Sequence, residues 1–348
     1  MAIRPLPLKA PPALVCDWLE MTVAATARGK YSLHRLKRIW DVNRETENSD
    51  PEGFRARERD TDDDGVSGED ADAYLDSISD EIGERETALG VSYPFELGVG
   101  GNTIKLKQPL GAGGYIYLFC LFLSNSKQGD ILDGSWTPAI DHVTRDLFQA
   151  CSTLAAAGEI TGSAISFGWP RPNNNPPFLV RLREVYERFG EGVVRPDPVP
   201  GASPWPKDEE IDVIAWRPTF DHAPGTEYML GQVASGDNWE AKSVKGPPIE
   251  SFHRNWFMPP PASPARPAIF IPHLITPNQT GSRRDVMDQH TATYGTVVDR
   301  LRLPRFANRG IELAELPGQP YFIERREDIN RIIEWVNTQM ITLQAMPQ

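Results

Sequence analysis

Residues 209–216 read EEIDVIAW, an apolar run that carries one carboxylate inside it. Five of the eight residues are apolar and give the stretch the composition of a buried β-strand. Asp212 lies among them, where an ionised carboxylate loses hydration and costs free energy unless a partner compensates it. The stretch therefore predicts a buried strand with a carboxylate whose presence needs an explanation, either structural or functional.

The elements predicted around this strand follow a definite order. FLVRLREVYERF (178–189) predicts a helix that stops at Gly190, and GVVRP (192–196) predicts a short strand. EYMLGQVAS (227–235) and PAIFIPHLIT (267–276) predict two more strands, separated by a helical or irregular segment over residues 238–257. With EEIDVIAW in its place, the order is helix, strand, strand, strand, helix, strand.

This order resembles the core of the PD-(D/E)XK, or restriction-endonuclease-like, superfamily over about residues 178–275. EEIDVIAW is similar to the second core strand of Mrr-type members, in which the aspartate is a metal ligand. The resemblance implies an α/β (α+β) fold with a mixed sheet flanked by helices. It also implies Mg²⁺ (or Mn²⁺) as the cofactor, because a hard cation polarises a phosphodiester and generates hydroxide from water at neutral pH.

The resemblance places the rest of the site on the next strand. Gln232 stands where the family has its second ligand, and the backbone carbonyl of Val233 is the customary additional ligand of the metal. The family's lysine position is Ala234, which departs from the pattern. Lys242, just after the strand, is the predicted replacement that steadies the attacking water, and Lys245 is the second choice.

The family also has an acidic residue on the helix before the strands. Glu184 is the predicted residue, with Glu187 as an alternative, although Leu179 occupies the offset from the terminal glycine that Mrr-type helices use. Gln149, on an earlier predicted helix, is a further candidate.

A basic and aromatic group of residues predicts a face for the phosphate backbone of DNA. Its predicted contacts are Trp239, Arg254, Arg283, Arg284 and Arg305. Four further members come from the same part of the chain: Trp256, Arg300, Arg302 and Arg309. An ordinary solvated face is the alternative interpretation.

The charge of the chain is concentrated in one segment. The formal net charge is −12, and residues 58–85 contain 12 acidic and 2 basic residues, which leaves −2 for the rest of the chain. The net charge therefore does not exclude a nucleic-acid partner. The D-x-D-x-D-G opening at Asp60, Asp62 and Asp64 resembles an EF-hand loop, but Ala71 stands where the bidentate glutamate belongs, so a solvated acidic loop is the preferred interpretation.

Two domains are expected, an N-terminal α+β domain over residues 1–165 for recognition or regulation and a nuclease-like domain over residues 166–348. In the first, VSYPFELG (91–98), NTIKLKQPLG (102–111) and YIYLFCLFL (115–123) predict strands. An amphipathic helix is predicted from Tyr74 to Ile82, and a second helix, N-capped by Thr137, is predicted to stop at Gly158.

The C-terminal part predicts two packing helices. One, over residues 282–303, would have Val286, His290, Tyr294, Val297 and Leu301 on one face, and the other covers residues 328–343.

Other classes of function find little support. The three cysteines, Cys16, Cys120 and Cys151, are too far apart in sequence for a zinc or disulfide pattern. The sequence has no HExxH, Walker or G-x-S-x-G motif, and its longest apolar run is half a membrane span, so we expect no membrane association and a cytoplasmic location.

The resemblance thus implies a Mg²⁺-dependent DNA endonuclease that serves in bacterial restriction or anti-phage defence, together with a partner protein or as a homo-oligomer. The alternative is a catalytically inactive nuclease-fold subunit that binds DNA or a partner protein.

Overall fold

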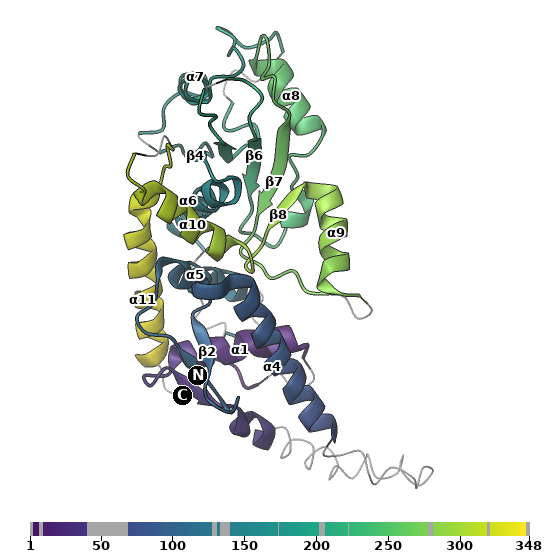
Figure 1. The fold of residues 1–348 in the computed structure, drawn as a ribbon, viewed down its shortest axis with the longest axis vertical. Helices are drawn as coiled ribbons and strands as arrows, with labels where there is room; N and C mark the ends of the chain where they lie inside the picture. The colour runs from purple at the N-terminus through teal and green to yellow at the C-terminus, as the bar shows by residue number, and fades with distance from the viewer. Residues whose placement is uncertain are drawn as a thin grey trace. The chain divides into compact units, whose positions relative to one another are not determined.

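The computed structural model describes residues 3–6, 10–39, 69–126, 131–132, 140–172, 174–201, 206–221, 223–277, 281–318 and 321–345. The chain forms two compact units (Figure 1). The first comprises Met1–Leu110, Gln128–Thr137 and Asn337–Gln348, and the second comprises Gly111–Lys127 and Pro138–Val336. These units do not follow the expected boundary at residue 165, because helices on both sides of that residue pack into the same sheet unit.

A mixed five-stranded sheet forms the centre of the second unit, in the order β4-β5-β6-β7-β8. The strands are β4 (Ser163–Ser166), β5 (Val213–Trp216), β6 (Tyr228–Val233), β7 (Ala265–Phe270) and β8 (Thr296–Val298). β5 pairs antiparallel with both β4 and β6, whereas β6–β7 and β7–β8 are parallel. The predicted strands in EEIDVIAW, EYMLGQVAS and PAIFIPHLIT are confirmed.

One predicted strand of this series is wrong. GVVRP contributes only an isolated bridge between Val194 and Phe257. The sheet instead takes its first strand, β4, from residues that precede the helix at 178–189. Two valines between Gly192 and Arg195–Pro196 are too short a pattern to separate a strand from an extended loop.

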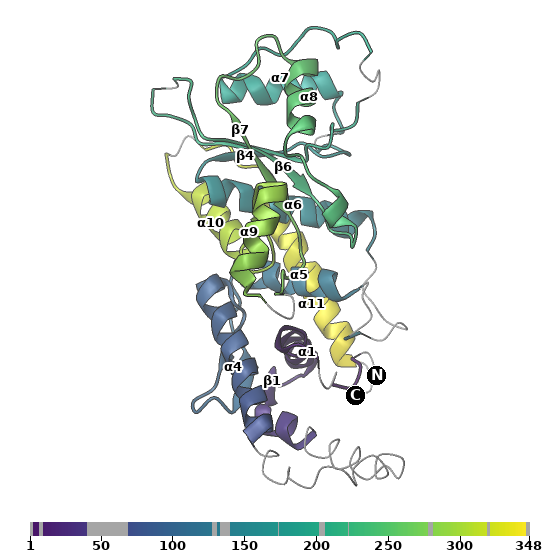
Figure 2. The same cartoon turned by 90° about the vertical axis from the view of Figure 1, so that its right-hand side faces the viewer.

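Two helices cover one face of the sheet, α7 (Phe178–Phe189) and α8 (Pro247–Trp256), as Figure 2 shows. Their apolar faces pack on Ile214, Leu230 and neighbouring strand residues to form the larger core cluster of this unit. α7 ends at Gly190 with φ 83°, as its sequence predicts, because a left-handed residue is favourable for glycine.

The opposite face carries α6 (His142–Ile160) and α10 (Leu303–Glu315) (Figure 2). The two helices cross at Gly158 and Gly310. A Cβ at Gly158 would lie 1.8 Å from the backbone oxygen of Phe306, so the backbones touch there. The prediction that Gly158 ends the helix is therefore wrong: the helix continues to Ile160, begins after an Asp141 cap, and uses Gly158 for close packing. Thr137, the predicted cap, lies outside the described residues.

YIYLFCLFL is a helix and not the strand that its sequence suggests. It lies within α5 (Ala112–Ser126), whose residues are buried on almost every side. An apolar run without alternation is compatible with a strand or a helix that is buried all round, and here the longer helical span prevails. Trp335 packs edge-on against Phe119 and Phe122 of α5.

The predicted helix over residues 282–303 is divided in the structure. α9 (Arg283–Tyr294) stops at Gly295, which has φ 82° and lies close to Pro267, and the chain then enters β8. Val297 therefore belongs to a strand and not to the face of the predicted helix. The final predicted helix is confirmed as α11 (Ile329–Ala345), which follows the short 3₁₀ turn η3 (Arg326–Asp328).

The first unit contains a three-stranded antiparallel sheet in the order β1-β3-β2 and two long helices. The strands are β1 (Lys30–Ser32), β2 (Phe95–Leu97) and β3 (Thr103–Leu106); the helices are α1 (Pro12–Ala25) and α4 (Glu69–Leu89), and η1 (Gly90–Ser92) follows α4. α4 confirms the helix predicted from Tyr74 to Ile82, and it includes the second half of the acidic segment, residues 69–85. Asp60, Asp62 and Asp64 lie outside the described residues.

Buried ion pairs connect helices α1 and α4. The Arg85 guanidinium of α4 pairs with Asp17 and Glu20 of α1, at 2.7 and 2.9 Å, and with Glu81. No helix in the described ranges is long and apolar enough to span a bilayer.

Candidate functional site

Asp212 is held by hydrogen bonds from three directions at the point where the chain enters β5. Its backbone N–H donates to Gly231 of β6 at 2.9 Å. Its backbone oxygen accepts from the N–H groups of Phe167 and Gly168, just after β4, and from the Nε2 of Gln149 on α6 at 2.6 Å. These contacts fix the aspartate at one edge of the sheet, where β4 and β6 end.

The Asp212 carboxylate is half-buried and has a single hydrogen-bond donor among the described residues. Its Oδ2 accepts from the backbone N–H of Val233 at 2.8 Å. Its Oδ1 lies against Gly168, where an added Cβ would be only 2.6 Å away. Glycine at that position therefore allows the chain after β4 to approach the carboxylate.

Burial raises the pKa of Asp212 to about 7. The hydrogen bond from Val233 and the positive charge of Lys242 oppose this rise in the pKa, whereas the nearby charges of Asp208 and Glu210 add to it. Loss of hydration destabilises the ionised form more than the single donor and the lysine stabilise it. A second positive charge at the carboxylate would lower this pKa.

Gln232 precedes Val233 on β6, the residue whose backbone N–H binds the Asp212 carboxylate. The β5–β6 register ends with Val213 opposite Gly231, and the Asp212 N–H donates to the backbone oxygen of the same Gly231, so the regular ladder stops at Asp212. Gln232 is 7% exposed, and its Oε1 is buried without a hydrogen-bond partner among the described residues. An oxygen in that state is costly and is available to bind a cation or a donor.

Lys242 and Lys245 differ in their surroundings. Lys242 is half-buried just after the 3₁₀ turn η2 (Trp239–Ala241), and its charge acts on Asp212. The Lys245 ammonium instead donates to the backbone oxygen of Ala292 at 2.6 Å. Ala234, at the family's lysine position, is 1% exposed and packs in an apolar cluster with Ile269.

Glu184 is engaged in ion pairs along its own helix, α7. It pairs with Arg181 at 2.9 Å and with Arg188 at 3.6 Å on α7, and Arg181 also binds Glu324. Glu187 is exposed on the same helix. The side chain that reaches Asp212 from a helix is that of Gln149 on α6.

The basic and aromatic residues do not form one face. Trp256 and Arg300 are fully buried and cannot contact a ligand without unfolding. Arg283 pairs with Asp299, and Trp239 packs against His290 and Tyr294 at centroid distances of 5.2 and 5.4 Å. The remaining predicted contacts are exposed: Arg254, Arg284 and Arg305.

Sequence reasoning missed a second group of side chains beside Asp212. Trp169 follows Gly168, is 51% exposed, and has the Lys207 ammonium 5.1 Å from its ring centroid. Its backbone N–H donates to Asp208 at 3.1 Å. A tryptophan in the polar loop SFGWPRP was the available signal, since an exposed aromatic next to a charged edge is suited to ligand contact.

The groups that could bind a cation at this edge are oxygens: the Asp212 carboxylate, the amide oxygens of Gln149 and Gln232, and backbone oxygens, with the charges of Asp208 and Glu210 nearby. Within the described ranges, no three histidine, cysteine or acidic side chains gather in a way that would hold a metal ion. No protein-family model, curated protein or solved structure matches the chain.

Proposed function

We propose that this protein is a Mg²⁺-dependent nuclease that hydrolyses DNA phosphodiester bonds at the Asp212 edge of the mixed sheet. The observation that carries the proposal is the buried Oε1 of Gln232, which has no partner among the described residues and belongs to the residue before Val233, the hydrogen-bond donor to a carboxylate whose pKa is raised to about 7. Both groups are unfavourable as they stand, and one divalent cation would compensate both.

The residues at this edge fit a hard cation. Asp212 and Gln232 would hold Mg²⁺ (or Mn²⁺), with the backbone carbonyl of Val233 as a further oxygen, and Mg²⁺ prefers such a small number of oxygen ligands with open positions for water. Bound there, the cation would supply polarisation of the phosphate and a lowered pKa for a water molecule. The order of the sheet, with two antiparallel pairs followed by a parallel pair, also supports the proposal.

Three cationic or aromatic side chains would serve the substrate. Lys242 would orient the attacking water and stabilise negative charge that develops on the phosphate; the effect of its charge on Asp212 supports this role. Trp169 and Lys207 would contact a sugar or base and the backbone next to the scissile bond, since exposed aromatics stack on bases.

Cleavage assays with the full chain test the proposal. Plasmid, linear duplex and single-stranded DNA are incubated with Mg²⁺, with Mn²⁺ and with EDTA. We expect cleavage that requires the cation and disappears in Asp212→Ala while the circular dichroism spectrum is unchanged. An Asp288→Asn variant, which removes an exposed carboxylate from α9, serves as the control and should cleave normally.

A catalytically inactive, DNA-binding subunit is the second candidate function. The buried Ala234 favours it, because a lysine at that position is the usual catalytic group in the family that the sequence resembles. This alternative predicts DNA binding without nicking under every cation condition, and equal binding by the wild type and Asp212→Ala. A role in bacterial restriction or anti-phage defence, with a partner protein or as a homo-oligomer, follows from the same resemblance and belongs to the proposal.

A further inference from the structure

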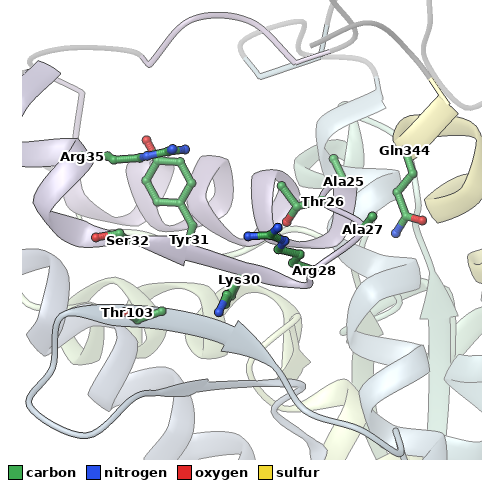
Figure 3. A pocket seen from close by; sticks show the side chains of 10 residues that line it. All are labelled: Ala25, Thr26, Ala27, Arg28, Lys30, Tyr31, Ser32, Arg35, Thr103 and Gln344. Carbon is green, nitrogen blue, oxygen red and sulfur yellow. The ribbon is translucent and has the colours of Figure 1, made fainter.

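A second site candidate lies in the first unit, separate from the sheet that carries Asp212. A cavity of about 570 Å³ opens beside β1, lined by residues from the end of α1, β1, β3 and the last turn of α11 (Figure 3). This volume lies within the range of small-molecule sites. Its lining contains polar hydroxyls as well as small apolar side chains.

The charged residues of this cavity are all cationic. Arg28, Lys30 and Arg35 line it, and no aspartate or glutamate is among the described residues that do so. None of the three forms an ion pair or side-chain hydrogen bond with a residue that the structure describes. The chain has 48 acidic and 36 basic residues, so a cavity whose described charged lining is entirely cationic is unexpected from the composition. Such a lining favours an anionic ligand.

Like charges also face each other around the cavity. Lys30 lies directly across the sheet from Lys105, and Lys105 is in turn paired with Glu96 at 2.8 Å, so no acidic residue in the described part of the chain compensates the Lys30 charge. In Figure 3 the side chains of Arg28 and Arg35 point toward each other past Tyr31. Like charges that face each other across a sheet repel and destabilise it. A bound anion would attract these cations, so their electrostatic contribution would become stabilising.

The uncharged wall suits a flat ring. The Tyr31 ring is held edge-on against Trp18, with centroids 5.6 Å apart and an interplanar angle of 88°. Ala25 and Ala27 contribute small side chains to the lining on the side of Gln344 (Figure 3). The Ser32 hydroxyl can donate to an oxyanion, whereas the Thr26 hydroxyl donates to the backbone oxygen of Val23 at 2.9 Å and can only accept from a ligand.

We propose that this cavity binds a nucleotide, with its phosphate on Arg28, Lys30 and Arg35 and its base against Tyr31. Arginine is suited to phosphate because its guanidinium donates two parallel hydrogen bonds. A small ligand is favoured over a nucleic-acid strand because the cavity has the size of a small-molecule site. The inference does not depend on catalysis at Asp212.

Isothermal titration calorimetry with the full chain, in EDTA, tests this assignment. AMP and ATP are compared with adenosine and with inorganic phosphate. We expect a nucleotide to bind at least about tenfold more tightly than either fragment, with an affinity that falls as salt rises. Arg28→Ala and Arg35→Ala should each weaken nucleotide binding by about tenfold, consistent with the loss of a charged hydrogen bond.

Two controls separate the cavity from other surfaces. Arg38→Ala removes an exposed arginine from the same helical segment, residues 33–39, that does not line the cavity, and it should leave the affinity unchanged. Asp212→Ala should also leave it unchanged, because that residue belongs to the other site. Tyr31→Leu should weaken AMP binding while binding of inorganic phosphate stays the same.

Four results would overturn the assignment. The first is the absence of nucleotide binding at millimolar concentration, and the second is equal affinity of Arg28→Ala, Arg35→Ala and the wild type for the nucleotide. The third is inorganic phosphate that binds as tightly as AMP. The fourth is a short single strand of DNA that binds this cavity more tightly than a nucleotide does.

Discussion

Asp212 makes the stability of the protein depend on pH in a definite direction. Its pKa is about 7 in the folded chain, compared with 3.8 as the ordinary value. The folded state therefore holds a proton that the unfolded state has already released. The stabilisation from this protonated carboxyl group is fully present below pH 3.8, its pKa in the unfolded chain. It is lost as the pH rises from 3.8 through about 7.

Asp212→Asn should for this reason stabilise the protein at high pH in metal-free buffer. The variant retains an oxygen for the Val233 N–H and cannot ionise. At about pH 8 with EDTA we expect a higher melting temperature than that of the wild type, with a gain in unfolding free energy of up to about 4 kcal/mol, at about 1.4 kcal/mol per pKa unit. The gain should shrink steadily toward about pH 4.

Addition of Mg²⁺ should reverse that order. The cation binds the folded wild type and raises its melting temperature, while the variant lacks the charged ligand and gains little. Equal melting temperatures for both proteins across the pH range would show that the Asp212 carboxylate is well solvated and is not compensated by a cation.

Gln232→Leu separates a binding role from a structural one. Its Oε1 has no partner in the described part of the chain, so an apolar side chain of similar size should leave the unfolding free energy within about 1 kcal/mol of the wild-type value or raise it. Cleavage and the Mg²⁺-induced shift in melting temperature should both be lost. A loss of several kcal/mol in chemical denaturation would instead assign the amide to the fold.

Lys242 and Lys245 form a matched pair of variants. Lys242→Met should lower the cleavage rate by about 100-fold, in line with the loss of one electrostatic stabiliser, and should raise the pKa of Asp212 further. Lys245→Met removes an ammonium that binds the Ala292 carbonyl and should leave the rate within about twofold, because that lysine does not face the carboxylate. The opposite ranking in single-turnover kinetics would move the catalytic role to Lys245.

At the scale of elements, the contact between α6 and α10 depends on glycine. Gly158→Ala would place a methyl group on the Phe306 carbonyl and should destabilise the second unit by about 3 kcal/mol or more. Gly83→Ala, in α4 with nothing within 4 Å of its added Cβ, is the matched control and should stabilise by about 0.5–1 kcal/mol. Thermal unfolding of both variants measures the difference, and equal effects would show that the helices do not touch at Gly158.

The elements show where local pattern was sufficient and where it was not. Local signals predicted five elements: β5, β6 and β7 are short apolar runs, α7 and α11 have amphipathic spacing, and α7 also has a glycine stop. The helical state of YIYLFCLFL and the interruption at Gly295 depend on neighbours that are distant in sequence. An apolar run forms a helix or a strand according to the elements that pack around it. Position 295 requires glycine because its backbone lies so close to Pro267 that a Cβ would not fit.

At the scale of the whole molecule, the candidate site could be predicted only in part. Asp212, Gln232 and Lys242 lie within about 30 residues of one another, so a single segment of sequence contains the pattern. Gln149, Gly168 and Trp169 reach the same edge through α6 and β4, which the sequence did not place beside β5. Long-range strand pairing brings them together, and no local spacing encodes it.

One measurement tests the central claim most directly: the anomalous difference density of crystals soaked in Mn²⁺. The account predicts one strong peak shared by the Asp212 carboxylate and the Gln232 amide oxygen, and its absence in crystals of Asp212→Asn. If the wild-type crystals show no peak at this edge while Lys242 forms a direct ion pair with Asp212, the edge is not a divalent-cation site.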